Sequence, residues 1–534
     1  MTMIKKPKKE KFNLHPLRAF IVAIALIIWA FYELATQGET LWYWFFLVVG
    51  GIIILPNVFW LASKLGTPFG VPYFFTMLKT KKFVNTIIGL GSGKTAKILE
   101  KVSIGGLFLG FGLAGIDYWT AREKGGIKRI LILIIGAIGL GLIFWYLLGI
   151  LFATPALSPL FWFSLIAFVL LGFGGLTIAI LLGYGVLAVM ALFTAEQICP
   201  SVFPVLPGVP IPGIGVLIPL IGWVSLGAIM VIHELSHGVM LAKYKEKLKS
   251  VGLILVGIVP MGAFVEQKDE SFMKKPERKQ ILVLSAGPSS NLFTMVIGIV
   301  LLILLYASIP LISGPIDMEN MKAIDGLEIA AVGESINLCG IDYNSPAYGK
   351  LFEGDRLISL NGVSAEEIVE SGIKLENRVV FNYESFMNRA QNSGEISFKP
   401  AEFVVDRNGE DFNIIIQPVL IEQFNVGYSG VDGLRKISSG YVVPLWVEIE
   451  STIILNLDKI IFFFIILSFA VGMFNFMPSD PLDGGRIAKF VLLPYVGFMG
   501  FNKEDGQKFI GRLFAWVFLI SILLNLLPYV TMFL

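Results

Sequence analysis

Apolar stretches long enough to cross a membrane recur along the chain, separated by short charged segments. A membrane-spanning helix needs about 20 mostly apolar residues. Such runs lie at 17–36, 41–63, 130–152, 159–194, 281–307, 459–478 and 509–533, and the charge-free stretch from Leu217 to Ile232 leads into a helix predicted over 220–242. The pattern therefore predicts a polytopic α-helical membrane protein.

Three segments depart from this simple pattern. Residues 159–194 are longer than one crossing needs and carry glycines in their middle, which predicts either one tilted helix or a tight hairpin. Residues 200–219 are rich in proline and glycine and cannot form a regular helix. At membrane depth such a segment must be buried in protein or line a cavity. Residues 250–266 predict a short β-hairpin that dips towards the membrane.

The segment 64–127 is rich in lysine and glycine and predicts a basic cytoplasmic loop. Its weakly apolar part, 103–116, predicts either an amphipathic segment or a short span. The stretch from Gly89 to Thr95 reads GLGSGKT and suggests a phosphate-binding loop. That pattern requires glycine at position 88, where this chain has Ile88, so we reject a nucleotide site here.

Residues 315–440 change character, because they hold many acidic residues and lack any spanning run. They predict a soluble α+β domain inserted between membrane helices. The pairs Asn361-Gly362 and Asn408-Gly409 are typical of two-residue hairpin turns. The segments 326–332 and 345–362, with the closing strand after Asn408-Gly409, resemble a PDZ domain of the bacterial protease type.

Composition supports a membrane protein and excludes some functions. Hydrophobic residues make up 55% of the chain and charged residues only 15%, against about 25% charged in soluble domains. A net charge of +2 gives no reason to expect nucleic acid as a partner. The lysines at positions 5–11 predict a cytoplasmic N-terminus. Cys199 and Cys339 lie far apart and predict neither a metal pair nor a disulfide framework.

The sequence His233-Glu234-Leu235-Ser236-His237 carries the candidate chemistry. Two histidines at i and i+4 share one face of a helix and can bind one metal ion, and the glutamate between them can act as base for an activated water. Ionisable groups inside a bilayer are costly and are functional by default. We therefore interpret this helix as a membrane-embedded metal site.

A catalytic zinc ion usually has three protein ligands and one position for water. The chain has only one further histidine, His15, in the basic N-terminal tail, so the third ligand is expected to be a carboxylate. Asp483 is the best candidate and Asp480 its nearest rival. An aspartate beside Gly484-Gly485 is also common in turns without a metal.

Four motifs together give the chain a specific resemblance. HELSH at 233–237, AGPSSN at 286–291, the PDZ-like insert and NFMPSDPLDGG at 475–485 occur in this order. The chain resembles the site-2 proteases, a family of intramembrane zinc metalloproteases, over 214–534. The resemblance implies a site-2-protease-like transmembrane core with an inserted PDZ-like α+β domain. It does not cover 1–200, about which it implies nothing.

The resemblance also implies roles for individual residues. His233, His237 and Asp483 would bind one zinc ion per chain, and Glu234 would be the general base. Asn475 and Asn291 match asparagines associated with the active-site region and the substrate. The expected substrates are transmembrane segments of single-pass, membrane-tethered proteins. A helical substrate must unwind before hydrolysis, and the hairpin at 250–266 could hold it as an added strand.

The expected organisation follows from these elements. Residues 1–200 form N-terminal transmembrane segments and a cytoplasmic loop; 201–310 form the protease core with the HExxH helix and the hairpin; 315–440 form the extracytoplasmic PDZ-like domain; and 441–534 carry the LDG motif and the last helix. The active site is expected towards the cytoplasmic side of the cell membrane. An odd number of crossings must precede the HExxH helix, whereas the clear spans number four, so either 159–194 crosses twice or another stretch crosses.

Two other functions remain open at this point. One is a non-catalytic receptor or transporter with a zinc site and a PDZ-like peptide-binding domain. A transporter is expected to show internal repeats of broken helices, and none is evident in the sequence. The other is a pseudoprotease, against which stands the presence of Glu234 and all three ligand candidates. The sequence does not identify the substrate or the oligomeric state.

Overall fold

The computed structural model describes residues 75–148, 159–194, 218–256, 259–267, 274–338, 341–370, 400–421 and 426–529, with a few short pieces between these ranges. The predicted spans at 17–36 and 41–63 lie outside the described residues except for a helical piece at 25–29 and the single residue 50. Most of the segment 200–219 and both cysteines also lie outside them.

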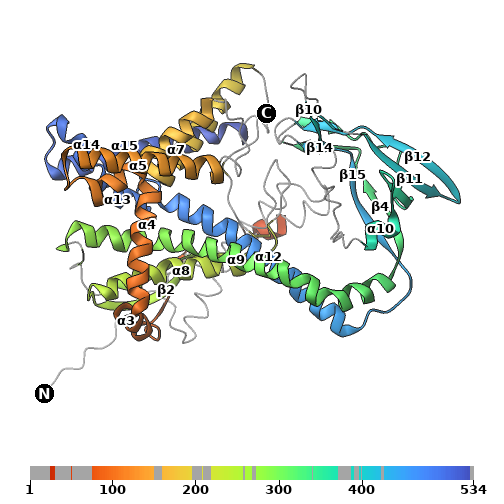
Figure 1. Ribbon diagram of the computed structural model, residues 1–534, viewed down its shortest axis with the longest axis horizontal. Coiled ribbons are helices and arrows are strands. Elements are labelled where there is room, and N and C mark those ends of the chain that lie inside the picture. The colour runs from red at the N-terminus through yellow and green to blue at the C-terminus, as the bar shows by residue number, and fades with distance from the viewer. Residues whose placement is uncertain are drawn as a thin grey trace.

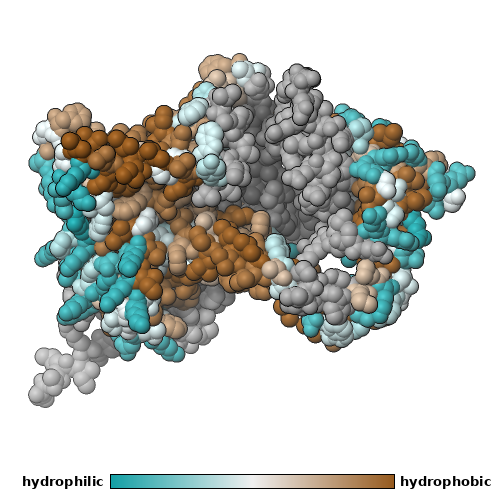
Figure 2. All heavy atoms as spheres, viewed as in Figure 1, coloured by the Kyte–Doolittle hydropathy of each residue, from teal (hydrophilic) through white to brown (hydrophobic). Residues whose placement is uncertain are grey.

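Seven helices in the described ranges are long and apolar enough to cross a membrane. They are α4 (Lys94–Ile116, continuing as a π-helix over Asp117–Ala121), α5 (Gly126–Ile143, continuing as a π-helix over Phe144–Leu148), α7 (Pro159–Thr194), α8 (Gly222–Lys243), α9 (Glu277–Lys322), α12 (Leu445–Asn475) and α15 (Lys503–Asn525). Figure 1 shows how they are arranged, and Figure 2 shows hydrophobic residues gathered over them. The predicted polytopic helical membrane protein is confirmed.

The loop predicted for 64–127 is wrong from Val84 onward, because α3 (Val84–Ser92) and α4 occupy this segment. Lys94, Lys97 and Lys101 lie at exposed positions in the first turns of α4, and the apolar remainder of the helix packs against α7 and α9. Asp117 at the end of α4 is buried, and Arg129 of α5 donates to both of its oxygens at 2.7 and 2.8 Å. This pairing lets a carboxylate lie in an apolar helix bundle.

Helix α7 turns back on itself at Gly172, which has φ +58°. Beyond the turn its two arms lie side by side, since a Cβ at Gly183 would meet the side chain of Leu160. The hairpin alternative for 159–194 is therefore the one observed. A second glycine with positive φ, Gly112 at +52°, breaks α4 in the same way.

The predicted hairpin is formed by β2 (Leu248–Val256) and β3 (Val259–Gln267). A third strand, β1 (Phe75–Thr80), pairs antiparallel with β2 and was not predicted. The order β1-β2-β3 leaves the outer edge of β3 without a partner strand among the described residues. At the base of the sheet, hydrogen bonds from Lys249, Ser250 and Lys79 lower the pKa of the Glu266 carboxyl to about 2.

The inserted segment forms its own sheet and core. The main sheet has the order β12-β11-β7-β4-β15, with β8 beside β7. Its strands are β4 (Ile324–Val332), β7 (Arg356–Leu360), β8 (Val363–Ser364), β11 (Ala401–Arg407), β12 (Glu410–Ile416) and β15 (Val431–Ser438). The remaining elements are α10 (Ala365–Glu370), β5 (Ser335–Leu338), β6 (Ile341–Asn344), β9 (Met387–Arg389), β10 (Ile396–Phe398), β13 (Val419–Ile421) and β14 (Val426–Tyr428). A separate cluster of buried residues, including Phe403 and Leu327, lies at its centre.

The two predicted hairpin turns in this domain are present. Asn361 and Gly362 join β7 to β8, and Asn408 and Gly409 join β11 to β12. All four residues have positive φ, between 52° and 88°. This conformation is the reason that Asn-Gly is favoured at such turns.

Helices α9 and α12 run together from the helix bundle to the inserted sheet (Figure 1). The span predicted at 281–307 is longer than expected, since α9 continues to Lys322 and displaces the predicted domain start at 315 to Ile324. Its extension stays packed: Ile316 is buried, and Asn320 donates to Ser451 of α12 at 3.4 Å. The span predicted at 459–478 belongs to a longer helix, α12, which begins at Leu445.

Candidate metal centre

Helix α8 carries the HELSH motif within an apolar bundle. Between Gly222 and Lys243 the only charged side chain before the terminal lysine is Glu234. His233 and His237 lie one turn apart with ring centroids 4.9 Å from each other. Ser236, between them in sequence, donates to the carbonyl of Ile232 and takes no part in the cluster.

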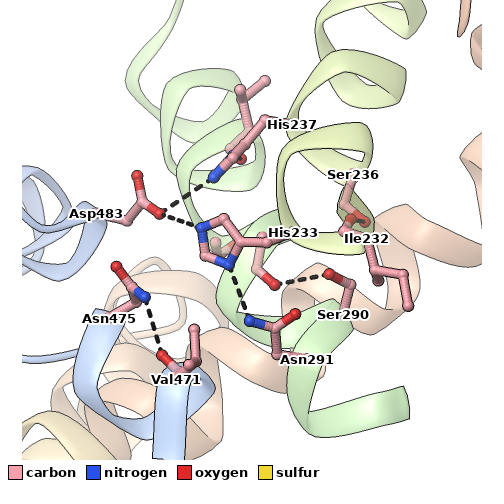
Figure 3. A network of polar contacts seen from close by, with 12 residues as sticks. Ile232, His233, Ser236, His237, Ser290, Asn291, Val471, Asn475 and Asp483 are labelled. Carbon is pink, nitrogen blue, oxygen red and sulfur yellow. Dashed lines mark hydrogen bonds and ion pairs between the residues drawn. The ribbon is translucent and has the colours of Figure 1, made fainter. Parts of the chain in front are cut away.

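Asp483, the first residue of α13 (Asp483–Val491), completes the group. Its Oδ2 lies 3.2 Å from Nε2 of His233 and 3.1 Å from Nε2 of His237 (Figure 3). Asp480 does not join them, since its carboxylate is exposed and paired with Lys489. The geometry thus groups Asp483, and not its rival, with the two histidines.

The LDG segment depends on its glycines to bring Asp483 to this position. A Cβ at Gly484 would meet the backbone of Phe476 and Met477, and a Cβ at Gly485 would lie 2.5 Å from the amide nitrogen of Asp480. Side chains at these positions would push α13 away from the end of α12. The small residues therefore fix the distance between the carboxylate and the α8 histidines.

The three residues fit a zinc ion. Ligand atoms from all three lie within 4.8 Å of one another. Zinc holds nitrogen and oxygen ligands tetrahedrally at about 2.0–2.2 Å, which places ligand atoms roughly 3.3 Å apart. The observed separations of 3.1 and 3.2 Å agree with that spacing. Two imidazoles and one carboxylate also match the ligand types of catalytic zinc sites.

Outer hydrogen bonds orient both imidazoles. Nδ1 of His237 donates to the carbonyl of Val283 at 2.7 Å, which leaves Nε2 free to bind a metal. Nδ1 of His233 lies 3.0 Å from the amide of Asn291, whose Oδ1 is buried without a hydrogen-bond partner among the described residues. Turning this amide by half a rotation lets Oδ1 accept from Nδ1, which satisfies the oxygen and frees Nε2 of His233 as well.

Asn291, which the resemblance associates with the active-site region and the substrate, is fully buried and contacts Nδ1 of His233. In this position its amide can orient the imidazole. Asn475 donates to the carbonyl of Val471 at 2.9 Å, and it lines the cavity in front of the metal centre.

A cavity of about 1070 Å³ opens onto the cluster. His233, Glu234, His237 and Asp483 line its floor, and strand β3 contributes Phe264, Val265 and Gln267. The backbone of Val265 lies close to the carboxylate of Glu234, and both residues line the cavity. The cavity wall also carries the polar side chains Gln280, Arg486 and Gln507, which can hold water beside the site.

Gly287 belongs to the site but was not predicted from the sequence, because glycine has no functional side chain. Gly287 of α9 faces the two histidines, and a Cβ there would lie 2.6 Å from Nε2 of His233 and within contact of Nε2 of His237. Only a residue without a side chain leaves space at the two ligand atoms. Gly287 lies within the AGPSSN motif, but the sequence of this motif does not predict that α9 packs closely against α8.

Gly287→Ala is therefore expected to weaken zinc binding by about tenfold or more, because overpacking a tight contact costs about 1–3 kcal/mol. Zinc retained during dialysis against a chelator measures the effect. Gly227→Ala on α8 is the matched control, since nothing lies within 4 Å of its added Cβ. Equal zinc retention in the two variants would show that Gly287 does not face the ion.

Comparison with known proteins gives consistent matches. The model of Peptidase family M50 matches residues 221–503. An uncharacterized protein, MJ0971, of Methanocaldococcus jannaschii is 24% identical over 302 residues, which cover 56% of this chain and 62% of that protein. The zinc metalloprotease RasP of Shouchella clausii is 28% identical over 281 residues, 48% of this chain and 60% of RasP. The chain thus spans about three-fifths of the length of these relatives.

Proposed function

The chain belongs to Peptidase family M50, and on that premise we propose that it is a zinc-dependent intramembrane endoprotease that cleaves transmembrane segments of membrane-tethered proteins. The observation that carries the proposal is the group of His233, His237 and Asp483, with Glu234 beside it, in a cavity among apolar helices. The name and metal use of the RasP relative give further support.

The proposed mechanism assigns one task to each residue of the site. A bound zinc ion supplies a Lewis acid that polarises the scissile carbonyl and acidifies a water molecule. His233, His237 and Asp483 would hold one ion per chain. Glu234 would accept the proton of the attacking water and deliver it to the leaving amine. Its carboxylate lines the cavity beside Val265 of β3.

The substrate is proposed to bind as an extra strand on β3. A helical transmembrane segment has no free backbone groups, so it must unwind before its peptide bond can be attacked. The edge of β2 is covered by β1, whereas the outer edge of β3 is bare within the described residues. Because Val265 of β3 contacts Glu234, a strand added there would lie along the catalytic carboxylate. Asn475, on the cavity wall, is proposed to contact that strand.

The inserted domain is proposed to be PDZ-like, to lie outside the cytoplasm and to select substrates. Its separate core, its position at the far end of α9 and α12 and the two Asn-Gly hairpins support this assignment (Figure 1). The metal centre is correspondingly proposed to face the cytoplasmic side. The lipid bilayer and single-pass membrane proteins are the proposed partners.

Metal-dependent cleavage tests the function directly. Purified protein in proteoliposomes should cut a single-pass model substrate, should lose this activity with a zinc chelator and should regain it with added zinc. A receptor or transporter would bind such a segment without cutting it. Intact substrate under conditions in which the protein retains about one zinc ion per chain would refute the proposal.

A further inference from the structure

We propose that two glycine-hinged helix reversals, both before the region matched by the family model, hold the third zinc ligand in position through Phe476. The reversals are the turn of α4 at Gly112 and the turn of α7 at Gly172. This inference rests on the proposed function, since it assigns the N-terminal helices a part in the same metal centre. The residues concerned are positioning residues.

The two reversals are built alike. Gly112 and Gly172 have φ of +52° and +58°, a conformation that side chains rarely adopt. Each is followed three residues later by a glycine that packs against the preceding arm. A Cβ at Gly115 would lie 2.6 Å from the carbonyl oxygen of Leu107, and one at Gly175 would lie 2.7 Å from the Cβ of Leu171. Glycine at all four positions allows the arms to fold back tightly.

The reversals also pack directly against each other. A Cβ at Gly112 would lie 2.5 Å from the carbonyl oxygen of Val169, and one at Gly172 would lie 2.5 Å from the carbonyl carbon of Gly110. Backbone therefore touches backbone at the junction, with no side chain between. Such a junction is stiff, because neither partner can adjust by changing a rotamer.

Phe476, the residue after the end of α12, is held by this junction. Its ring is fully buried and forms an edge-to-face contact with Phe111 at 6.3 Å between centroids. A Cβ at Gly110 would lie 2.5 Å from ring atoms of Phe476. A Cβ at Gly174 would lie 2.5 Å from its carbonyl oxygen. One reversal thus contacts the side chain of Phe476, and the other contacts its backbone.

The same backbone of Phe476 supports the zinc ligand from its other side. Gly484, the neighbour of Asp483, packs against the carbonyl group of Phe476. Contacts therefore run from the reversals to Phe476, from Phe476 to Gly484, and so to Asp483. A shift of Phe476 by a few tenths of an ångström would move the carboxylate relative to His233 and His237. A metal site tolerates little movement of a ligand, because metal–ligand distances must stay within about 0.2 Å of their usual values.

The two contacts to Phe476 allow a compensation test. Gly110→Ala should weaken zinc affinity about tenfold or more, and Phe476→Leu in the same chain should restore it, because the three atoms nearest to the added Cβ all belong to the ring. Gly174→Ala should weaken zinc affinity similarly, but Phe476→Leu should not restore it, because this clash involves the backbone oxygen. Gly105→Ala on α4 is the control, since nothing lies within 4 Å of its Cβ.

The readouts separate positioning from simple destabilisation. Zinc affinity is measured by competition with a chelator and compared with the thermal midpoint of each full-length variant, and kcat and KM are measured where the parent cleaves. We expect Gly110→Ala to lower zinc affinity and kcat with KM nearly unchanged. The inference would be overturned if Gly110→Ala matched Gly105→Ala in zinc affinity, or if Phe476→Leu restored both variants equally. The zinc measurement stands even if the parent protein cleaves no substrate.

Discussion

Glu234→Gln is expected to reduce cleavage of a membrane substrate by about 10²–10⁴-fold while zinc stays bound, because general-base catalysis contributes this much to the rate. Glutamine keeps the size of the side chain and its place in the cavity beside Val265. It cannot accept the proton of the attacking water. The measurement is the single-turnover cleavage rate in proteoliposomes, with zinc content determined on the same sample.

The control for this variant is Glu504→Gln on α15. Its carboxylate is exposed, pairs with Lys508 one turn away and does not line the cavity. It should cleave at close to the parent rate. A Glu234→Gln variant that cleaves as fast as the parent would contradict the assignment of the base, and one that loses zinc would show that Glu234 helps to hold the ion.

Asp483→Ala is expected to remove zinc and activity together. The carboxylate supplies one of three ligand atoms, and it contacts both imidazoles at 3.1 and 3.2 Å. Loss of an outer partner of a metal ligand already costs about 10–100-fold in affinity, so loss of a ligand should cost more. Metal analysis after dialysis and the cleavage rate are the two readouts.

Asp480→Ala gives the matched comparison, because it removes a carboxylate from the same turn. Asp480 is exposed and paired with Lys489, and an exposed pair contributes at most about 1 kcal/mol. This variant should therefore retain zinc. If the two variants exchanged behaviour, the third ligand would be Asp480, and the proposed geometry of the centre would be wrong.

Short-range patterns predicted the parts of the site that depend on local geometry. The i, i+4 spacing of His233 and His237 places both rings on one helical face whatever surrounds the helix. The Asn-Gly pairs required positive φ, and the structure has it at both hairpins. Residue reasoning alone left the third ligand open between two aspartates of one turn, because their separation in sequence does not reveal which of them points at α8.

Other features depended on contacts between distant segments and could not be predicted. The helix periodicity of α4 and α7 does not reveal that single glycines at 112 and 172 reverse them. No repeat is evident in the sequence, so the similar construction of these two broken helices was not predicted. Strand β1 pairs with β2 about 175 residues away, and neither strand indicates the other. The contact between Asn291 and His233 depends on how α9 packs on α8, which the sequence does not reveal.

The position of the cut in a single-pass substrate tests the central claim most directly. Mass spectrometry of both fragments, made by the purified zinc-loaded protein in sealed proteoliposomes, identifies the scissile bond. A catalytic centre formed by α8 and α13 among apolar helices predicts a bond inside the apolar segment of the substrate. Cleavage confined to its soluble flanks, or no cleavage that depends on Glu234, would contradict intramembrane proteolysis by this chain.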